Sequence, residues 1–444
     1  MTIAKYTENY DSGLAWLGAV PKHWSLKRLG HFFSERREKV SDKEFQPLSV
    51  TKHGIVPRLE TAAKTQDGDN RKRVIAGDFV INSRSDRKGS SGLSELDGSV
   101  SLICIVLEPD GVYGRFAHHL LRSEVFQEEF YRNGKGIVAD LWSTGFSEMK
   151  NIVIPVPSQH EQTQIARFLD HETAKIDALI REQERLIELL QEKRQAVISH
   201  AVTKGLDPDV PMKDSGVEWL GEVPAHWRVM KFLRCVRIAE GQVDPKLSPY
   251  SDMILIAPNH VQSQTGRILE TETAETQGAE SGKYVCKPGD VIYSKIRPAL
   301  RKACIIDYPA LCSADMYPLR PSEQLTGQFL LWSILSEPFS RLAILESERV
   351  AMPKINRESI NEIYLAVPPV DEQRGICKFI TDETKRLDDL SSVAHQSMGI
   401  LKERRSALIS AAVTGKIDVR DWQPPVDESA FDEEVRQAGI EATT

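Results

Sequence analysis

Basic and amide side chains gather at two places in this 444-residue sequence, around residues 71–91 and around residues 259–302. Arginine and lysine can contact phosphates or donate to O6 and N7 of guanine, while asparagine and glutamine match the N6/N7 edge of adenine. The candidate DNA contacts of the first cluster, with one lysine upstream of it, are Lys52, Arg71, Lys72, Arg73, Asn82, Arg84, Arg87 and Lys88. Those of the second cluster are Asn259, Gln262, Gln264, Arg267, Lys295, Arg297, Arg301 and Lys302. A solvated loop would explain any one cluster, but two clusters in an internal repeat, with different side chains, favour two surfaces that read different DNA sequences.

The sequence offers little support for catalysis. It has no G-x-x-x-x-G-K-[ST] phosphate loop, no H-E-x-x-H, no G-x-S-x-G, and no [DNS]-P-P-[YFW] tetrapeptide of the kind an amino-methyltransferase needs. His118 and His119 are adjacent, so they cannot place both rings on one helix face as metal ligands. Asp209 with Lys213 is a weak candidate for nuclease chemistry. We therefore assign no catalytic residue and no metal site.

The two clusters belong to a long internal repeat. DSGLAWLGAVPKHW at residues 11–24 recurs as DSGVEWLGEVPAHW at residues 214–227, with ten of fourteen positions identical. We call these two stretches the tryptophan motifs. The repeat continues from residues 76–92, 154–177 and 190–205 to residues 288–304, 365–388 and 401–416. The parts around the polar clusters have diverged, whereas the last two segments are much alike, so the chain repeats one architecture with two different surfaces.

The tryptophan motifs contain Trp16, Trp24, Trp219 and Trp227, each motif with a proline between its two tryptophans. A base-stacking role is conceivable for such residues. Their spacing is more typical of packed side chains, and we also expect His23 and His226 to be structural.

The conserved ends of the two halves predict long helices of about 30 residues, or roughly 45 Å at 1.5 Å per residue. Ser158 and Glu161 have the spacing of a capping box, in which Glu161 reaches back to the N-cap, and Asp371 is the expected cap of the second helix. Gly205 and Gly415 are expected C-cap positions.

A heptad stripe follows along both predicted helices. Its seam positions are Ile176, Leu179, Leu186, Leu190, Val197, Leu387, Leu390, Leu401 and Leu408. An ordinary two-helix core would give the same stripe. Equal length and register favour an antiparallel coiled coil that separates two similar domains and acts as a ruler between them.

The segments before these helices predict short strands. VSLICIVLEP at residues 100–109 and DVIYSKI at residues 290–296 are rich in valine and isoleucine, and Gly77-Asp78 and Gly289-Asp290 are expected turns. Helical stretches are expected near residues 116–131 and 328–344. The predicted fold class is α+β, with two domains of bent β-sheet, two long antiparallel coiled-coil helices and a pseudo-two-fold internal repeat.

Charge is unevenly distributed. The net charge is −7, and residues 418–444, with eight acids and two arginines, carry −6 of it. The nearly neutral remainder allows local basic patches but not a uniformly basic surface. The six cysteines are scattered, which favours reduced thiols. No apolar run is long enough to span a membrane and the first residues lack an apolar signal core, so we expect a cytoplasmic protein without membrane contact.

Together these motifs resemble the specificity (S) subunits of type I restriction–modification systems. The resemblance rests on DSG..WLG.VP.HW in both halves, on VP…EQ..I at residues 156–165 and 367–376, and on the helix ends LQEKRQAVISHAVTKG and LKERRSALISAAVTGK. It covers residues 11–416. It implies two target-recognition domains, at residues 1–157 and 206–368, and two spacer helix regions, at residues 158–205 and 369–417, leaving residues 418–444 as an acidic tail.

The resemblance also implies a non-catalytic subunit that reads a bipartite, asymmetric site in double-stranded DNA. Adenine methylation would come from two modification subunits that bind S-adenosylmethionine. Cleavage would come from restriction subunits that use ATP and Mg²⁺, so no cofactor is expected on this chain. The alternative is a helical scaffold whose domains bind proteins and read no DNA, and a third, weaker alternative is an autonomous nuclease.

Overall fold

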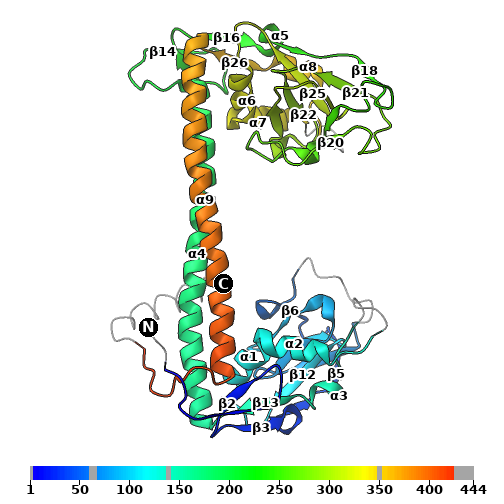
Figure 1. Ribbon diagram of the computed structural model, residues 1–444, viewed down its shortest axis with the longest axis vertical. Coiled ribbons are helices and arrows are strands. Elements are labelled where there is room, and N and C mark those ends of the chain that lie inside the picture. The colour runs from blue at the N-terminus through cyan, green and yellow to red at the C-terminus, as the bar shows by residue number, and fades with distance from the viewer. Residues whose placement is uncertain (1–3, 60–67, 137–141, 348–352, 425–444) are drawn as a thin grey trace. The chain divides into compact units, whose positions relative to one another are not determined.

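The computed structural model describes residues 4–59, 68–136, 142–347 and 353–424 (Figure 1). Contacts divide the chain into unit 1, residues 1–183 and 396–444, and unit 2, residues 184–395. The division cuts through helices α4 (Gln159–Lys204) and α9 (Val370–Val413), so each unit contains half of each long helix. The predicted segmentation into two domains, two helix regions and a tail is a division by chain order, and it stays a prediction.

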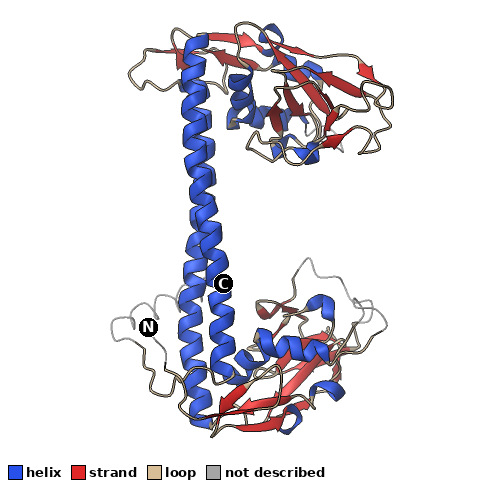
Figure 2. Cartoon of the chain, in the orientation of Figure 1, coloured by secondary structure: helices blue, strands red, loops and turns tan. Residues whose placement is uncertain are grey.

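Unit 1 combines short strands with short helices beside the halves of α4 and α9 (Figure 2). Its strands are β1 (Asn9–Asp11), β2 (Ala19–Pro21), β3 (Ser25–Arg28), β4 (Phe33–Glu35), β5 (Lys39–Val40), β6 (Leu48–Thr51), β7 (Gly54–Pro57), β8 (Arg71–Val74), β9 (Phe79–Asn82), β10 (Ser91–Leu93), β11 (Gly98–Ser101), β12 (Cys104–Pro109) and β13 (Val153–Val156). Its short helices are α1 (Gly114–Arg122), α2 (Glu124–Arg132) and α3 (Phe146–Met149).

Unit 2 repeats these elements in the same order. Its strands are β14 (Met212–Asp214), β15 (Glu222–Pro224), β16 (Arg228–Lys231), β17 (Val236–Ile238), β18 (Gln242–Val243), β19 (Ile254–Ile256), β20 (Glu272–Thr273), β21 (Lys283–Cys286), β22 (Val291–Ser294), β23 (Ala303–Ile305), β24 (Ala310–Cys312), β25 (Met316–Pro321) and β26 (Tyr364–Val367). Its short helices are α5 (Phe232–Cys235), α6 (Gly327–Leu335), α7 (Glu337–Ser347) and α8 (Arg357–Glu362).

Each unit is built on open sheets. In unit 1 the strand orders are β10-β9-β12-β4 and β11-β8-β5, and in unit 2 they are β17-β25-β22-β23 and β18-β21-β24-β19-β20. The consecutive strands β8 and β9 lie in different sheets, as do β11 and β12, so the chain passes from one sheet to the other twice. Unit 2 does the same with β21 and β22 and with β24 and β25. This passage realises the predicted bend, and the α+β class is confirmed.

The two Gly-Asp turns connect these sheets as predicted. Gly77 and Gly289 have φ of 100° and 88°, a left-handed conformation that costs glycine little. Asp78 accepts from the amide of Ile75 at 2.8 Å and forms an ion pair with Arg36. Asp290 accepts from the amide of Lys287 at 2.8 Å and pairs with Arg320 in the same way. The same buried carboxylate therefore fixes the same turn in both units.

The single helical stretch predicted for each domain is two helices in the structure. α1 ends and α2 begins at Ser123, whose hydroxyl accepts from the amide of Phe126. Ser336 occupies the corresponding position between α6 and α7. Because serine competes for backbone hydrogen bonds and caps helices well, the break follows from one residue in each repeat.

The long helices start close to the predicted residues but are longer than predicted. Ser158 caps α4 through the amide of Glu161, while α9 starts at Val370, so Asp371 lies in its first turn and is not the cap. The helices have 46 and 44 residues instead of about 30, or roughly 70 Å each. The prediction was short because it counted only the heptad stripe and left out the first turns, where Ile165 packs on unit 1 and Ile376 on unit 2.

The predicted heptad seam is partly wrong. Ile176, Leu190 and Leu387 are buried and Val197, Leu401 and Leu408 are half-buried, but Leu179, Leu186 and Leu390 are exposed. The residues of an 11-residue repeat are buried instead, with one half-buried methionine among them: Ile165, Ile176, Ile187, Ile198, Ile376, Leu387, Met398 and Ile409. A straight helix drifts about 20° per heptad away from a heptad stripe, whereas 11 residues complete nearly three turns. The helix pair therefore follows the longer repeat.

Ion pairs join the long helices in both units. Arg405 pairs with Asp177 in unit 1, with its Nε 2.8 Å from the carboxylate, and Arg194 approaches Asp388 to 3.3 Å in unit 2. Arg194 and Asp177 lie 211 residues before Arg405 and Asp388, so this is the same pair twice. In each unit the residue number rises along α4 as it falls along α9, which confirms the antiparallel pairing.

Both long helices end against a tryptophan motif. Gly205 and Gly415 have φ of 78° and 73°, as expected of left-handed C-caps. A Cβ on Gly205 would lie 3.3 Å from the Trp227 ring, and one on Gly415 would lie 2.2 Å from Pro21. The end of α4 thus packs on the second motif and the end of α9 on the first.

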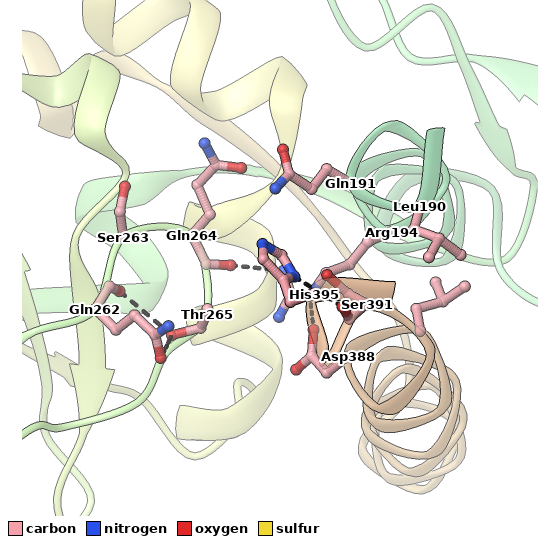
Figure 3. A pocket seen from close by; sticks show the side chains of 11 residues that line it. Leu190, Gln191, Arg194, Gln262, Ser263, Gln264, Thr265, Asp388, Ser391 and His395 are labelled. Carbon is pink, nitrogen blue, oxygen red and sulfur yellow. Dashed lines mark hydrogen bonds and ion pairs between the residues drawn. The ribbon is translucent and has the colours of Figure 1, made fainter. Parts of the chain in front are cut away.

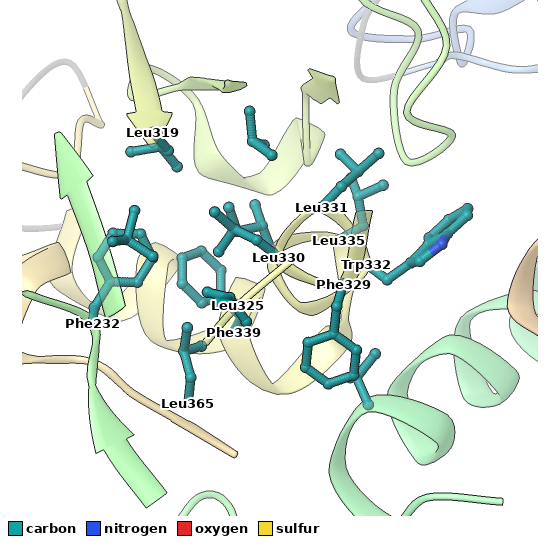
Figure 4. Close-up of a cluster of buried hydrophobic side chains, with 14 of the residues drawn as sticks. Phe232, Leu319, Leu325, Phe329, Leu330, Leu331, Trp332, Leu335, Phe339 and Leu365 are labelled. Atoms are coloured by element: carbon teal, nitrogen blue, oxygen red, sulfur yellow. The ribbon is translucent and has the colours of Figure 1, made fainter. Parts of the chain in front are cut away.

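The tryptophans are scaffold residues, as predicted. Trp227 and Trp24 are 0 % and 3 % exposed, and Trp16 and Trp219 pack against the edges of the same cores. In unit 2 this core is dominated by α6 and α7, whose leucines and aromatic rings interlock (Figure 4).

The first residues of the predicted acidic tail belong to unit 1. The amide of Asp418 donates to the carbonyl oxygen of Ala4, and Trp422 packs edge-on against Phe168. Residues 425–444 lie outside the described residues.

Candidate nucleic-acid interface

The glutamate and glutamine of the VP…EQ..I motif attach each recognition surface to its long helix. Glu161 accepts from the hydroxyl of Tyr6 at 2.5 Å and bonds His23 at 3.0 Å, so it does not reach back to its own N-cap as predicted. Glu372 bonds His226 at 2.8 Å and accepts from the indole of Trp227 at 2.9 Å. Burial, with Glu161 adding to it, raises the pKa of Tyr6. The histidines before the tryptophans are thus structural, as expected.

The neighbouring glutamines hold the short helices. Gln162 accepts from the amide of Tyr113, where α1 begins, and donates to the carbonyl oxygen of Pro157. Gln373 accepts from the amide of Thr326, where α6 begins, and donates to Pro368. Both glutamines are 2 % exposed or less. One motif therefore fixes the angle between the long helix and the elements that carry the polar clusters.

The loop after the central strand is tied down alike in both units. In unit 1 the amide of Ser85 donates to the carbonyl oxygen of Trp142 at 3.0 Å, and Arg84 bridges to Ser143. In unit 2 the amide of Arg297 donates to the carbonyl oxygen of Pro353 at 2.9 Å. These loops carry part of each predicted cluster, so their backbones are held while their side chains differ.

Unit 2 also concentrates backbone strain in its cluster. Gln264, Arg297 and Arg301 have φ of 65°, 48° and 47°, and among the described residues they alone combine a positive φ with a side chain other than glycine's hydrogen. Such conformations cost energy and persist where the surroundings enforce them, commonly at functional sites. The amide of Gln264 donates to the carbonyl oxygen of Arg301 at 3.1 Å, which joins two loops that are far apart in sequence.

The long helices support the same loop of unit 2 (Figure 3). Arg194 of α4 donates to the carbonyl oxygen of Gln264 at 2.7 Å, and Asp388 of α9 pairs with Arg267 at 2.9 Å. Burial lowers the pKa of Arg194, and Asp388 opposes this effect. Arg194 is 8 % exposed, so it acts as a support for the loop and not as a surface contact.

The exposed members of the first predicted cluster are Lys52, Arg84, Arg87 and Lys88. The others serve the fold. Arg71 is 6 % exposed and donates to the hydroxyl of Ser99, and Lys72 bonds Glu35 and the carbonyl oxygen of Cys104. Arg73 pairs with Glu38 over the ring of Phe45, and Asn82 is buried and accepts from the amide of Arg84. We therefore leave residues 71–73 and Asn82 out of the surface that we propose below.

The second cluster lies mostly at the surface. Asn259, Gln262, Gln264, Arg267 and Arg297 are exposed. Lys295, Arg301 and Lys302 are half-buried: Lys295 lies over the ring of Tyr317, and Lys302 donates to the carbonyl oxygen of Pro258 at 2.6 Å. The surface of unit 2 thus presents amides and arginines, whereas that of unit 1 presents lysines and arginines.

Three residues of interest escaped the sequence reasoning. Trp142 is 40 % exposed beside the loop of Arg84, and its indole donates to the carbonyl oxygen of Gly136. Arg194 and Arg122 lie on helices, outside both clusters. An isolated tryptophan in a polar stretch was the available signal for Trp142, whereas nothing local distinguishes the two arginines.

Within the described ranges, no group of three or more His, Cys, Asp or Glu could hold a metal ion. All six cysteines are buried and free. None of the helices described is long and apolar enough to cross a membrane.

The chain is similar to known proteins along most of its length. The model of the type I restriction modification DNA specificity domain matches residues 238–392. The EcoDI specificity subunit of Escherichia coli, a type I restriction enzyme subunit, is 28 % identical over 428 residues, which cover 91 % of each chain. The MjaVIII specificity subunit of Methanocaldococcus jannaschii is 26 % identical and is matched over 90 % of this chain and 95 % of its own.

Two solved structures share the fold. A chain from a study of complex assembly and conformational transition of the type I R-M system superposes with a TM-score of 0.68 at 16 % identity, covering 90 % of this chain and 99 % of that one. The HsdS subunit from Thermoanaerobacter tengcongensis gives a TM-score of 0.52 at 17 % identity, over 90 % and 98 % of the two chains.

Proposed function

We infer that this chain, which belongs to the specificity subunits of type I restriction–modification systems, reads DNA through the exposed loops of its two units. The observation that carries this inference is the doubled loop support: one backbone arrangement holds Arg84 and Arg87 in unit 1 and Arg297 in unit 2. A sequence reader needs side chains held in register against base edges, because readout depends on hydrogen-bond geometry.

Each unit reads one part of a bipartite, asymmetric site. The scaffold contacts repeat almost residue for residue, while the exposed loop residues differ, and such an arrangement suits two readers of different sequences. Lysines and arginines in unit 1 suit phosphates and guanine, and Asn259, Gln262 and Gln264 in unit 2 add partners for adenine.

The subunit acts without catalytic residues of its own. Two modification subunits with bound S-adenosylmethionine would methylate adenine, and restriction subunits would supply ATP-driven translocation and Mg²⁺-dependent cleavage. The complex works in the cytoplasm, where the host DNA lies. What supports this division of labour is the family membership, together with a sequence that lacks the methyltransferase tetrapeptide and the phosphate loop.

The scaffold alternative is less favoured. A protein-binding role would not require strained, doubly tied loops with polar and cationic tips, and the matching family model describes a DNA specificity domain.

Selection from random duplexes tests the proposal. We expect the full-length chain, together with its modification partner, to enrich one bipartite sequence and to form a band with that duplex that a scrambled duplex does not compete away. The scrambled duplex has the same length and base composition, so it controls for phosphate contacts. Binding without any enrichment would leave the scaffold alternative as the better account.

A further inference from the structure

Unit 1 contains a cavity of about 400 Å³ where α1 and α2 approach α9. Four cationic side chains line it, together with one imidazole and one carboxylate: Lys52, Lys88, Arg122, Arg405, His118 and Glu124. Lys88 comes from the loop that also carries Arg84 and Arg87, so the cavity adjoins the proposed reading surface.

Most of the charges at this cavity are compensated. Lys88 pairs with Glu128, Arg405 pairs with Asp177, and Glu124 accepts from the hydroxyl of Ser406 at 2.7 Å. Arg122 differs, because no carboxylate among the described residues forms an ion pair with it. Its guanidinium donates to the carbonyl oxygen of Lys52. Burial lowers the pKa of Arg122, and the charge of Arg405 adds to this effect. A half-buried cation without a counter-charge favours an anionic partner.

His118 presents a second donor to the same space. Its Nδ1 accepts from the amide of Leu93 at 3.1 Å, so the proton of the neutral ring is on Nε2. Burial, followed by the effect of Arg122, lowers the pKa of His118 to about 3, which keeps the ring neutral at pH 7. Nε2 lies 3.1 Å from a guanidinium nitrogen of Arg122. Both nitrogens therefore carry hydrogens, neither can accept from the other, and an acceptor oxygen in the cavity would satisfy both.

The internal repeat indicates that this polar group is not needed for folding. α1 and α6 each have nine residues, begin with glycine and end before a serine. His118, His119 and Arg122 correspond to Leu331, Trp332 and Leu335, which lie in the apolar core of unit 2 (Figure 4). The same helix position is thus filled by hydrophobic side chains in one unit and by donors and a cation in the other.

We propose that this cavity, which we call the phosphoryl pocket and define by Lys52, Lys88, His118, Arg122 and Arg405, binds a phosphoryl group. Arg122 and His118 donate to one of its oxygens, and the lysines and Arg405 add positive potential. The inference rests on the proposed function in one respect: a backbone phosphate of the DNA read by unit 1 is the expected source. A free phosphate ion has the same chemistry, and the test separates the two sources.

The variants follow from the repeat. Arg122→Leu and His118→Leu install the residues that unit 2 has at these positions, so we expect neither to lower the melting temperature appreciably. Arg167→Gln is the matched control, because it removes one exposed positive charge from α4 of unit 1 outside the pocket. Two probes are used with each full-length variant: inorganic phosphate in a melting experiment, and labelled duplexes titrated at several salt concentrations in the presence of the modification partner.

We expect Arg122→Leu to weaken duplex binding about tenfold and to reduce the salt slope of log Kd by about 1, equally for selected and scrambled duplexes, as loss of one phosphate contact predicts. Arg167→Gln should keep the wild-type slope. If inorganic phosphate raises the melting temperature of the wild type but not of Arg122→Leu while the duplex slopes agree, the pocket binds a free phosphate ion. Equal slopes together with no effect of phosphate would overturn the pocket even where the duplexes are read selectively. Loss of sequence selection in the wild type would contradict the proposed function alone.

Discussion

Exchanging residues 30–151 for the corresponding segment of another specificity subunit is expected to change one half of the methylated DNA sequence and to leave the other half intact. The exchanged segment carries every exposed candidate contact of unit 1, namely Lys52, Arg84, Arg87 and Lys88. It leaves in place strand β3, strand β13 and the tryptophan motif, which attach the segment to α4. The recipient scaffold should therefore accept a new reader without a change in unit 2.

The reciprocal exchange of residues 232–363 is the control. It lies between the paired strands β16 and β26 and carries Asn259, Gln262, Gln264 and Arg297. We expect it to change the other half of the sequence. The modular account would be contradicted if either exchange altered both halves, or if the half that changed were the same for both. The readout is the methylation pattern of the host genome.

The substitution Trp227→Ala is expected to lower the free energy of unfolding of unit 2 by about 3–5 kcal/mol, the range for deleting a large buried aromatic side chain. Trp227 is fully buried, lies edge-on against Phe329 with ring centroids 6.4 Å apart, and donates to Glu372. Its loss opens a cavity and leaves a buried carboxylate without one of its partners. Denaturant titration followed by circular dichroism measures the change, and amide exchange assigns it to unit 2.

Trp142→Ala is the matched control for the same substitution. Because Trp142 is 40 % exposed, we expect its removal to change the free energy of unfolding by less than about 1 kcal/mol. It lies beside the loop of Arg84 and Ser85, so DNA binding is where its loss should be seen. Comparable destabilisation by the two substitutions would refute the assignment of Trp227 to the scaffold.

Much of the scaffold could be predicted from the sequence because its signals are local. Ser158 marks the start of α4, Gly205 and Gly415 mark the helix ends, and the Gly-Asp pairs mark the turns between the sheets. The internal repeat added confidence to each of these, since the same physical signal occurs twice. The seam of the long helices failed at Leu179, Leu186 and Leu390, because a heptad template was applied where burial follows 11 residues.

The candidate site was harder to predict because local chemistry does not distinguish a buried arginine from an exposed one. Arg71 and Arg84 lie 13 residues apart in one basic stretch, yet Arg71 bonds Ser99 across a strand pair and Arg84 is exposed. The partners that decide this difference come from distant parts of the chain. For the same reason, Arg122 and Arg194 acquire meaning only once α1 and α4 are placed beside the loops they contact.

Methylome sequencing of a host that expresses this chain with its modification partner tests the central claim most directly. The account predicts methylated adenines within a single bipartite motif, two specified parts separated by a gap of fixed length, which disappear when this chain is omitted. Methylation in a contiguous motif, or a pattern that is the same with and without this chain, would contradict it.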